Sequence, residues 1–193
     1  KYLKKNSDAF KDIPLLSDII NCDEQFKVAI ENYLEPFLNH FIVQSSEQAW
    51  NGLNKLNSEG KGRAHFFILD SFTSYQQTST HQIEGCIAAS TVIENDGRFQ
   101  SLMNYLLANV YIAQNSDVAA QANQNEIEGK IILSPDGKFY RQRYSISGGS
   151  VGSYDGKRTG RLKHLEKLAT EIQQHQQQTE VFKIELQQTE ELL

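Results

Sequence analysis

Residues 91–119 read TVIENDGRFQSLMNYLLANVYIAQNSDVA, and residues 18–49 read DIINCDEQFKVAIENYLEPFLNHFIVQSSEQA. Each segment contains a short apolar stretch, a turn, an amphipathic helix, a second apolar stretch and a polar cap that opens another helix. A repeated supersecondary unit of this kind indicates two similar lobes that pack on each other. The duplication favours an architectural role with symmetric binding surfaces over a single catalytic pocket.

The first copy predicts strands and helices in alternation. Residues 15–20 contain the apolar Leu15, Leu16, Ile19 and Ile20 and predict the first strand. The helix after the second strand should carry Trp50, Leu53 and Leu56 on one apolar face. Residues 64–69 form an apolar run that is typical of a strand buried on both faces.

The second copy closes differently from the first. Residues 130–133 predict a strand, residues 134–137 a tight turn, and residues 138–140 a returning strand, which together are typical of a hairpin. A further alternating segment, residues 144–149, ends in two glycines, and a glycine-rich, basic loop follows it.

The composition fits one domain with two lobes. The chain has 193 residues, of which 39% are hydrophobic and ten are Phe, and this is enough for a core. The net charge of -5 means that contact with nucleic acid would need a local basic patch. Cys22 and Cys86 are too few for a disulfide scaffold and lack metal-ligand spacing, so we interpret them as reduced thiols. No apolar run approaches the ~20 residues of a membrane helix.

A heptad pattern begins after Arg161. Its positions alternate by four and three residues: Leu165, Leu168, Ile172, His175, Thr179, Phe182, Leu186, Thr189 and Leu193. This spacing predicts a coiled-coil seam with polar interruptions. The alternative is an ordinary surface helix that ends near Ile172. The seam has no equal partner in the sequence, so either two copies meet there or the partner helix belongs to a longer parent protein.

Residues 148–152 match the G-x-S-x-G motif of serine hydrolases, with Ser150 as the nucleophile. That motif needs a helix directly after the serine, and an Asp and a His from separate strands. Here the loop after Ser150 stays rich in glycine. Asp155 and His164, the candidates for the catalytic Asp and His, lie too close to Ser150 in sequence to come from separate strands. A Ser hydrolase is therefore the disfavoured alternative. The loop also fails as a phosphate-binding loop, because Arg158 stands where Ser or Thr must bind magnesium.

Two features remain after these exclusions. Adjacent glycines at Gly148 and Gly149 form a plain turn or let the strand accept another chain as its neighbour. The second feature is a concentration of basic residues, which either solubilises the loop or contacts phosphates. Its members are Lys138, Arg141, Arg143, Lys157, Arg158, Arg161, Lys163 and Lys167.

Taken together, these segments resemble the hinge domain of the structural maintenance of chromosomes (SMC) proteins. The resemblance covers almost the whole chain, and it rests on the order and spacing of segments that are not decisive alone. They are residues 62–70, Leu133 with Asp136 and Gly137, residues 146–150, and Gly160 with Arg161.

The resemblance implies a mixed α/β fold, with two similar lobes that contain mixed sheets, inserted midway along a long antiparallel coiled coil. Residues 1–6 would end the incoming helix, and residues 161–193 would form the outgoing helix. Residues 7–160 would form the hinge, with lobes at about 7–76 and 80–160.

The family also implies a dimer, most simply a homodimer, in which two hinges join head to tail through edge strands. The implied interface residues are Ser145, Ile146, Ser147, Gly148, Gly149, Ser150 and Gly152. Family hinges also bind DNA non-specifically through basic residues, which here are Arg143, Lys157, Arg158, Arg161 and Lys163. The implied role is in chromosome condensation and segregation, in the cytoplasm and at the nucleoid.

The resemblance implies no catalytic residue, metal site or cofactor for this chain. ATP and Mg are expected only at the family's head domains, which lie at the far ends of the coiled coil. One departure concerns the pairing strand. Bacterial members often carry a second glycine pair just upstream, where this chain has Gln142, Arg143 and Tyr144, so its strand is bulkier and more charged.

Overall fold

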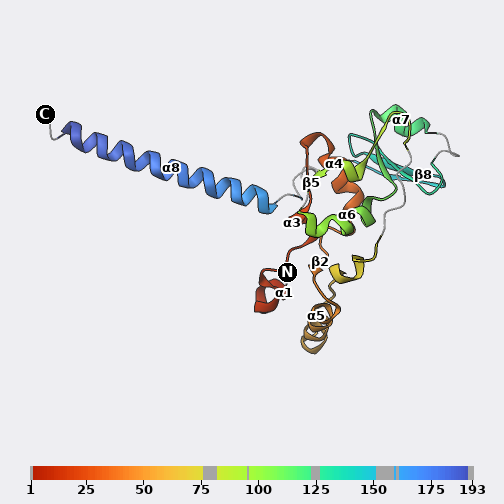
Figure 1. Ribbon diagram of the computed structural model, residues 1–193, viewed down its shortest axis with the longest axis horizontal. Helices are drawn as coiled ribbons and strands as arrows, with labels where there is room; N and C mark the ends of the chain where they lie inside the picture. The colour runs from red at the N-terminus through yellow and green to blue at the C-terminus, as the bar shows by residue number, and fades with distance from the viewer. Residues whose placement is uncertain are drawn as a thin grey trace. The chain divides into compact units, whose positions relative to one another are not determined.

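The computed structural model describes residues 2–75, 82–94, 96–122, 127–150, 159 and 161–190. Within the last range, the side chains of residues 161–167, 181 and 184–190 lie outside the description. The chain divides into two compact units, Lys1–Gly160 and Arg161–Leu193 (Figure 1).

The duplication expected from the sequence is present as two matching runs of elements (Figure 1). The first run consists of α3 (Leu16–Ile19), β1 (Asn21–Cys22), α4 (Glu24–Leu34), β2 (Phe41–Val43), α5 (Ser46–Glu59) and β3 (Phe66–Ile68). The second consists of the 3-10 helix η2 (Ala89–Thr91), β5 (Ile93–Glu94), α6 (Gln100–Leu107), β6 (Val110–Ala113), α7 (Ser116–Gln121) and β7 (Ile131–Leu133). The remaining elements are α1 (Tyr2–Asn6), α2 (Asp8–Lys11), η1 (Leu69–Phe72), β4 (Cys86–Ala88), η3 (Gly97–Phe99), β8 (Phe139–Gln142), β9 (Ser145–Gly148) and α8 (Arg161–Glu190).

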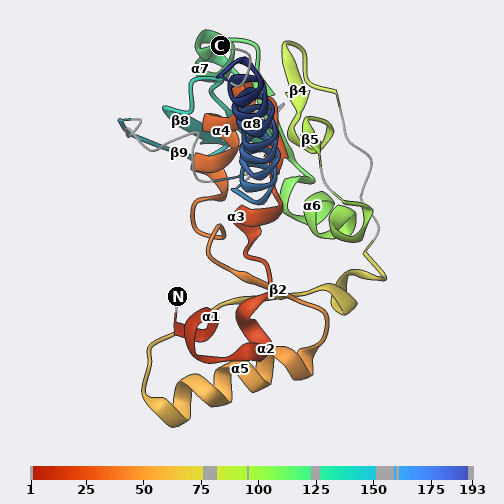
Figure 2. The same cartoon turned by 90° about the vertical axis from the view of Figure 1, so that its left-hand side faces the viewer.

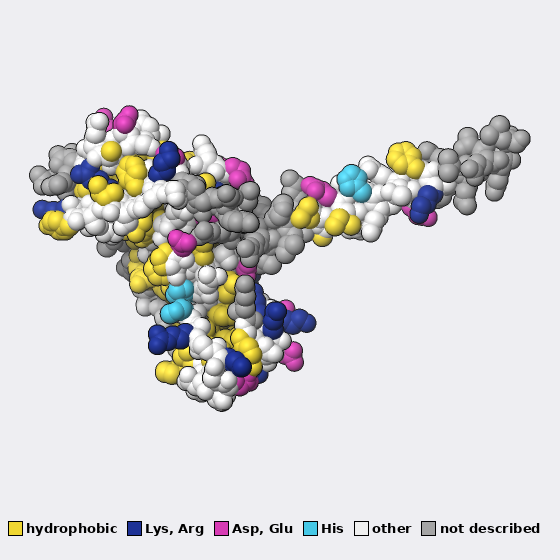
Figure 3. Space-filling view, turned by 180° about the vertical axis from the view of Figure 1, so that it is seen from behind, with side chains coloured by type: hydrophobic (Ala, Val, Ile, Leu, Met, Phe, Trp, Pro, Cys, Tyr) yellow, Lys and Arg dark blue, Asp and Glu magenta, His cyan; other side chains and the backbone are white. Residues whose placement is uncertain are grey.

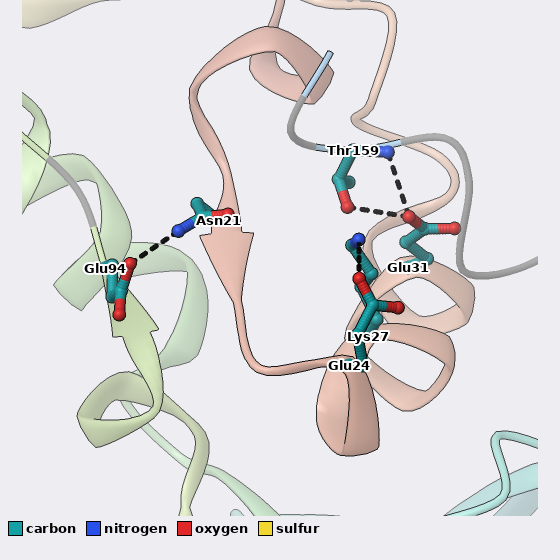
Figure 4. Close-up of polar contacts among 6 residues, drawn as sticks. All are labelled: Asn21, Glu24, Lys27, Glu31, Glu94 and Thr159. Atoms are coloured by element: carbon teal, nitrogen blue, oxygen red, sulfur yellow. Dashed lines mark hydrogen bonds and ion pairs between the residues drawn. The ribbon is translucent and has the colours of Figure 1, made fainter. Parts of the chain in front are cut away.

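The two copies share their strand pairing and meet each other directly. In both copies the two later strands run parallel, β2 with β3 and β6 with β7. The short strands β1 and β5 pair with one another in antiparallel fashion, with Asn21 opposite Glu94. The Asn21 amide donates to the Glu94 carboxylate at 2.5 Å (Figure 4). Equivalent parts of the two lobes therefore join across this antiparallel pair.

The second lobe is built on a five-stranded mixed sheet in the order β4-β6-β7-β8-β9. The predicted hairpin is confirmed, since β7 and β8 are antiparallel and Gly137 closes their turn at φ +70°. A second antiparallel pair, β8 with β9, extends the sheet to its edge. The mixed α/β class with mixed sheets is thereby confirmed.

Helices α5 and α7 begin on equivalent side-chain caps. The Ser45 hydroxyl accepts a hydrogen bond from the Gln48 N–H, and the Asn115 side chain accepts one from the Val118 N–H. The second cap, Asn115, directly precedes Ser116, the first residue of α7. Asn and Ser satisfy N–H groups that the first helical turn leaves unpaired, so both copies start this helix by the same chemistry.

The main hydrophobic core is shared by both copies. It contains Leu34 and Ile30 of α4 together with Leu102 and Leu107 of α6, all fully buried. Each lobe adds a smaller cluster of its own, around Phe10 in the first and around residues of β6 and α7 in the second. In the first lobe, α1 and α2 lie over α5 (Figure 2). Because apolar burial is the main stabilising term, the shared core should unite the two lobes.

The strand predicted for residues 15–20 is wrong. This segment forms the single helical turn α3, and the strand β1 begins only at Asn21. In this segment only Leu15 pairs as a strand residue, in an isolated antiparallel bridge with Phe41 of β2, which includes the bond from the Leu16 N–H to the His40 carbonyl. The Ser17 N–H bonds to the Leu38 carbonyl, before β2 begins, so the pairing does not continue along the segment. Leu16 and Ile20 are both fully buried, which four-residue spacing on a turn allows.

Two burial expectations for the first lobe are also wrong. Trp50 is 62% exposed, because α5 turns Ala49, Gly52 and Leu56 toward the core instead. A β-carbon at Gly52 would lie 2.8 Å from the Phe10 ring, so α5 packs against α2 on that side. Strand β3 is half-buried rather than buried on both faces.

The unit Arg161–Leu193 contains the 30-residue helix α8. Of its predicted seam, Leu168, Ile172 and Phe182 are exposed apolar residues. Leu165 and Leu186 lie outside the described side chains, so the coiled coil stays a prediction. In the part of the chain that the structure describes, no helix is both long enough and apolar enough to cross a membrane.

Candidate dimerisation surface

Strand β9 forms one edge of the five-stranded sheet. Within the described residues it pairs only with β8, and its outer edge carries no strand. Ile146 at its centre is 68% exposed, and Tyr144 just before it is 88% exposed. An unpaired strand edge with exposed apolar side chains is a template on which another strand can add.

The two glycines that end β9 have different roles. A β-carbon at Gly148 would lie 2.2 Å from the Lys138 carbonyl oxygen and 2.6 Å from Phe139 Cα. Gly148 therefore allows β9 to approach β8 inside the chain. At Gly149 a β-carbon would meet nothing within 4 Å, while the Gly149 N–H donates to the Lys138 carbonyl at 2.8 Å. Only Gly149 presents an open surface.

We expect Gly148→Ala to lower the free energy of unfolding by about 1–3 kcal/mol, because the new methyl group meets backbone atoms that cannot move aside. Gly149→Ala should change it by less than about 0.5 kcal/mol, since its surroundings are open. Urea denaturation of both variants, followed by circular dichroism, measures the difference. Equal losses in the two variants would contradict this division of roles.

The first lobe has an open edge of its own. Strand β3 corresponds to β7 in the duplication, but no hairpin like β8–β9 follows it, and the chain continues into η1 instead. Within the described residues β3 pairs only with β2. The sequence reasoning missed this edge. The signal that could have revealed it is the unequal closure of the two copies, which leaves one parallel strand without its antiparallel neighbour.

A groove of about 430 Å³ lies beside β3 and is lined by apolar and aromatic side chains. Its lining includes Trp50 and Leu53 from α5 and His65 at the start of β3. The His40 and His65 rings stack with their centres 4.8 Å apart. Figure 3 shows histidine side chains beside hydrophobic ones on one face of the molecule. Burial, followed by the nearby His65, lowers the pKa of His40 below 6.5. Its surroundings therefore favour the neutral form of the His40 side chain.

The structure brings most of the predicted interface residues together on one edge. Ser145, Ile146, Ser147 and Gly148 form β9, and Gly149 and Ser150 follow it directly. Gly152 lies outside the described residues. Gly149 and Ser150 also line a groove of about 460 Å³ that reaches Asn32 and Pro36 at the end of α4.

Of the predicted DNA-binding residues, only Arg143 has a described side chain. Arg143 pairs with the Glu128 carboxylate, and its guanidinium also lies 5.1 Å from the centre of the Tyr144 ring. Lys157 and Arg158 lie outside the described residues, as do the side chains of Arg161 and Lys163. DNA contact stays a prediction.

The hydrolase alternative gains no support from the surroundings of Ser150. Among the described side chains, the charged ones that share its groove are Glu35 and Lys138, and none is a histidine. The side chain of His164 lies outside the description. Residues 151–158, which contain Asp155, lie outside the described set. Among the described residues there is also no group of three or more His, Cys, Asp or Glu side chains placed to hold a metal ion.

Comparison with known proteins identifies relatives over most of the chain. Residues 10–123 match the family model of the SMC proteins Flexible Hinge Domain. The chain is 27% identical over 171 residues to the chromosome partition protein Smc of Chlorobaculum tepidum, and 29% identical over 157 residues to that of Mesomycoplasma hyorhinis. These alignments cover 89% and 78% of this chain. They cover only 14% and 16% of the two relatives, so the chain spans a small part of their length.

Solved structures of hinge domains share the fold. An asymmetric dimer of the Geobacillus stearothermophilus SMC hinge domain matches with a TM-score of 0.69 and 20% identity, over 88% of this chain and 72% of that one. The Pyrococcus furiosus Smc hinge domain with an extended coiled coil matches with a TM-score of 0.60 and 22% identity, over 95% of this chain and 65% of that one. The family model matches more than half of the residues, and the two-lobed architecture agrees with it, so this chain belongs to the SMC hinge domain family.

Proposed function

We propose that this chain is the hinge through which a chromosome-partition SMC protein forms a dimer with a second, identical hinge. The observation that carries this proposal is the pair of open strand edges, β9 in the second lobe and β3 in the first. The duplication makes these edges complementary, because β3 lacks the antiparallel neighbour that β7 has in β8. A second copy can supply that neighbour.

In the proposed dimer, β9 of each copy lies beside β3 of the other. A twofold axis makes one such contact imply the second, so the two hinges close on each other at both ends. Backbone hydrogen bonds between the edge strands supply affinity, and side chains in neighbouring grooves supply specificity. Tyr144 and Ile146 are the exposed apolar groups on one side, and Trp50 beside its groove is the matching group on the other.

Sedimentation equilibrium of the 193-residue chain tests the dimer. We expect a solution mass of twice the 21.9 kDa of one chain at micromolar concentrations. A mass of one chain that persists up to ~100 μM would contradict the proposal, since a hinge must hold its two arms together without help.

The helix α8 is proposed to be the root of a coiled-coil arm. Its exposed Leu168, Ile172 and Phe182 follow the heptad spacing and offer an apolar stripe to a second helix. The parent protein is proposed to be an ATPase whose nucleotide-binding heads lie outside this chain and which works at the nucleoid in the cytoplasm. DNA contact by the hinge itself is proposed through the predicted basic residues, of which only Arg143 has a described side chain, and that side chain pairs with Glu128.

A further inference from the structure

One face of α4 holds the segment from which the C-terminal helix departs. Glu31 of α4 is fully buried, and its Oε1 accepts hydrogen bonds from the Thr159 backbone N–H at 2.9 Å and from the Thr159 hydroxyl at 2.6 Å (Figure 4). Thr159 is itself buried and stands two residues before α8 begins. A buried carboxylate is costly unless donors satisfy it, so this contact fixes Thr159 to the helix.

The next two residues of α4 hold the β7–β8 hairpin. The Asn32 side chain donates to the Gly137 carbonyl at 2.7 Å. A β-carbon at Gly137 would lie 2.5 Å from Val28 Cγ1, so the hairpin turn packs tightly on the helix. The Tyr33 and Tyr140 rings meet edge to face with their centres 5.7 Å apart. Burial, with a smaller contribution from Tyr140, raises the pKa of Tyr33, as expected for a phenol packed at this contact.

The hairpin in turn carries the proposed dimer edge. Tyr140 of β8 stands opposite Ser147 of β9, and Phe139 stands opposite Gly148. Three consecutive residues in the last turn of α4 thus contact Thr159 on one side and the edge-bearing hairpin on the other. A short, hydrogen-bonded helix moves as a single body, so a displacement at one contact must be accommodated at the other.

We infer that α4 couples Thr159, in the segment that leads into α8, to the dimer edge, with Glu31 contacting Thr159 and Asn32 contacting the hairpin. The inference rests on the proposed function only in taking β9 as the dimer contact, since the coupling itself lies within one chain. Release of Thr159 loosens the β8–β9 hairpin, and release of the hairpin loosens Thr159. The segment at Thr159 and the dimer edge therefore influence each other through α4.

Amide hydrogen exchange of the 193-residue chain, followed by NMR, tests the coupling. The variant Thr159→Val removes the hydroxyl donor but keeps the side-chain shape, and Thr159→Ser keeps the donor as a matched control. Thr159→Val should speed exchange of the Gly149 N–H, which bonds to the Lys138 carbonyl, by about threefold or more. Thr159→Ser should leave it at the wild-type rate. The Gln114 N–H, which bonds to the Gly85 carbonyl elsewhere in the lobe, should not change in either variant.

The reverse experiment removes the contact between Asn32 and the hairpin. Coupling is reciprocal, so Asn32→Ala should speed exchange of the Thr159 N–H by a factor similar to that seen at Gly149. Glu31→Gln should act as Thr159→Val does, whereas Glu24→Gln, the same change at an exposed position of α4, should have no effect at Gly149. The coupling would be overturned if Thr159→Val changed exchange only near Thr159 and Asn32→Ala changed it only in the hairpin. A uniform rise in exchange rates that includes the Gln114 N–H would also overturn it.

A monomeric background separates this test from that of the proposed function. Trp50→Ala lies on the other side of the proposed contact, and exchange measured in this background, at a concentration where sedimentation gives the mass of one chain, reports the coupling without any dimer. If the chain never dimerises, the proposed function fails, and the exchange at Gly149 still decides the inference. If it does dimerise, Thr159→Val should also raise the dissociation constant by about threefold or more.

Discussion

Replacement of Ile146 by aspartate should convert a dimer of this chain into monomers. Ile146 lies at the centre of the open strand β9 and is exposed in the single chain, so a partner strand would cover it. Burying an unpaired carboxylate costs several kcal/mol, and a twofold dimer contains the substitution at both contacts. We expect the dissociation constant to rise by at least ~100-fold, which corresponds to about 2.8 kcal/mol. Sedimentation equilibrium over a range of concentrations measures it.

The opposite edge of the same sheet provides the matched control. Ile87 is the central residue of β4 and is 41% exposed, so Ile87→Asp introduces the same charge into an equivalent strand. We expect this variant to remain a dimer. Trp50→Ala, on the first-lobe side of the proposed contact, should weaken the dimer as Ile146→Asp does. If Ile87→Asp were monomeric and Ile146→Asp remained dimeric, the dimer interface would lie at β4 and not at β9.

Glycine substitutions test the same surface less cleanly. Gly148→Glu would disrupt the approach of β9 to β8 within one chain, so a monomer obtained with it would not distinguish lost pairing from a damaged hairpin. Gly149→Glu avoids this difficulty, because the space around Gly149 is open. It should therefore give monomers whose circular dichroism spectrum matches that of the parent chain.

The sequence predicted the repeated unit because both copies keep the same local signals. Helix α4 has apolar residues at helical spacing, and α6 repeats them, so periodicity alone was sufficient for both. The hairpin after β7 was predictable from Asp136 and Gly137, since few residues adopt its backbone conformation. The strand prediction for residues 15–20 was wrong because a short, largely apolar segment fits a strand or a buried helical turn equally well. Only the distant partners of Leu16 and Ser17 decide between them.

The candidate site was predictable in its location but not in its contacts. The alternating segment before two glycines indicated the edge strand β9, yet nothing local separates the role of Gly148 from that of Gly149. That difference depends on how closely β8 passes. The contact between Glu31 and Thr159 joins residues that are 128 positions apart, so no pattern along the chain could indicate it. The position of Trp50 on an exposed face depends on α2, which packs on the other side of α5.

Truncation of the shared core should show that the two lobes unfold together. Leu34 and Leu107 are the last residues of α4 and α6, occupy equivalent places in the two copies, and are both fully buried in the cluster that the lobes share. Leu34→Ala and Leu107→Ala should each lower the free energy of unfolding by about 2–5 kcal/mol, through lost apolar burial and the cavity left behind. Urea denaturation at one fixed chain concentration measures the loss, since dimerisation makes stability depend on concentration.

The two cysteines report the two copies separately in the same experiment. Cys22 lies in β1 of the first copy, where burial raises its pKa to about 11, and Cys86 lies in β4 beside the second. Cys22 is buried and Cys86 half-buried, so the readout is the urea concentration at which the reactivity of each thiol rises to its unfolded value. The two midpoints should coincide in both variants, because a core that spans the lobes makes their unfolding a single transition. If Leu107→Ala exposed Cys86 at a lower urea concentration than Cys22, the lobes would be independent domains. The antiparallel pair β1–β5 would then be a contact between them rather than part of one folded body.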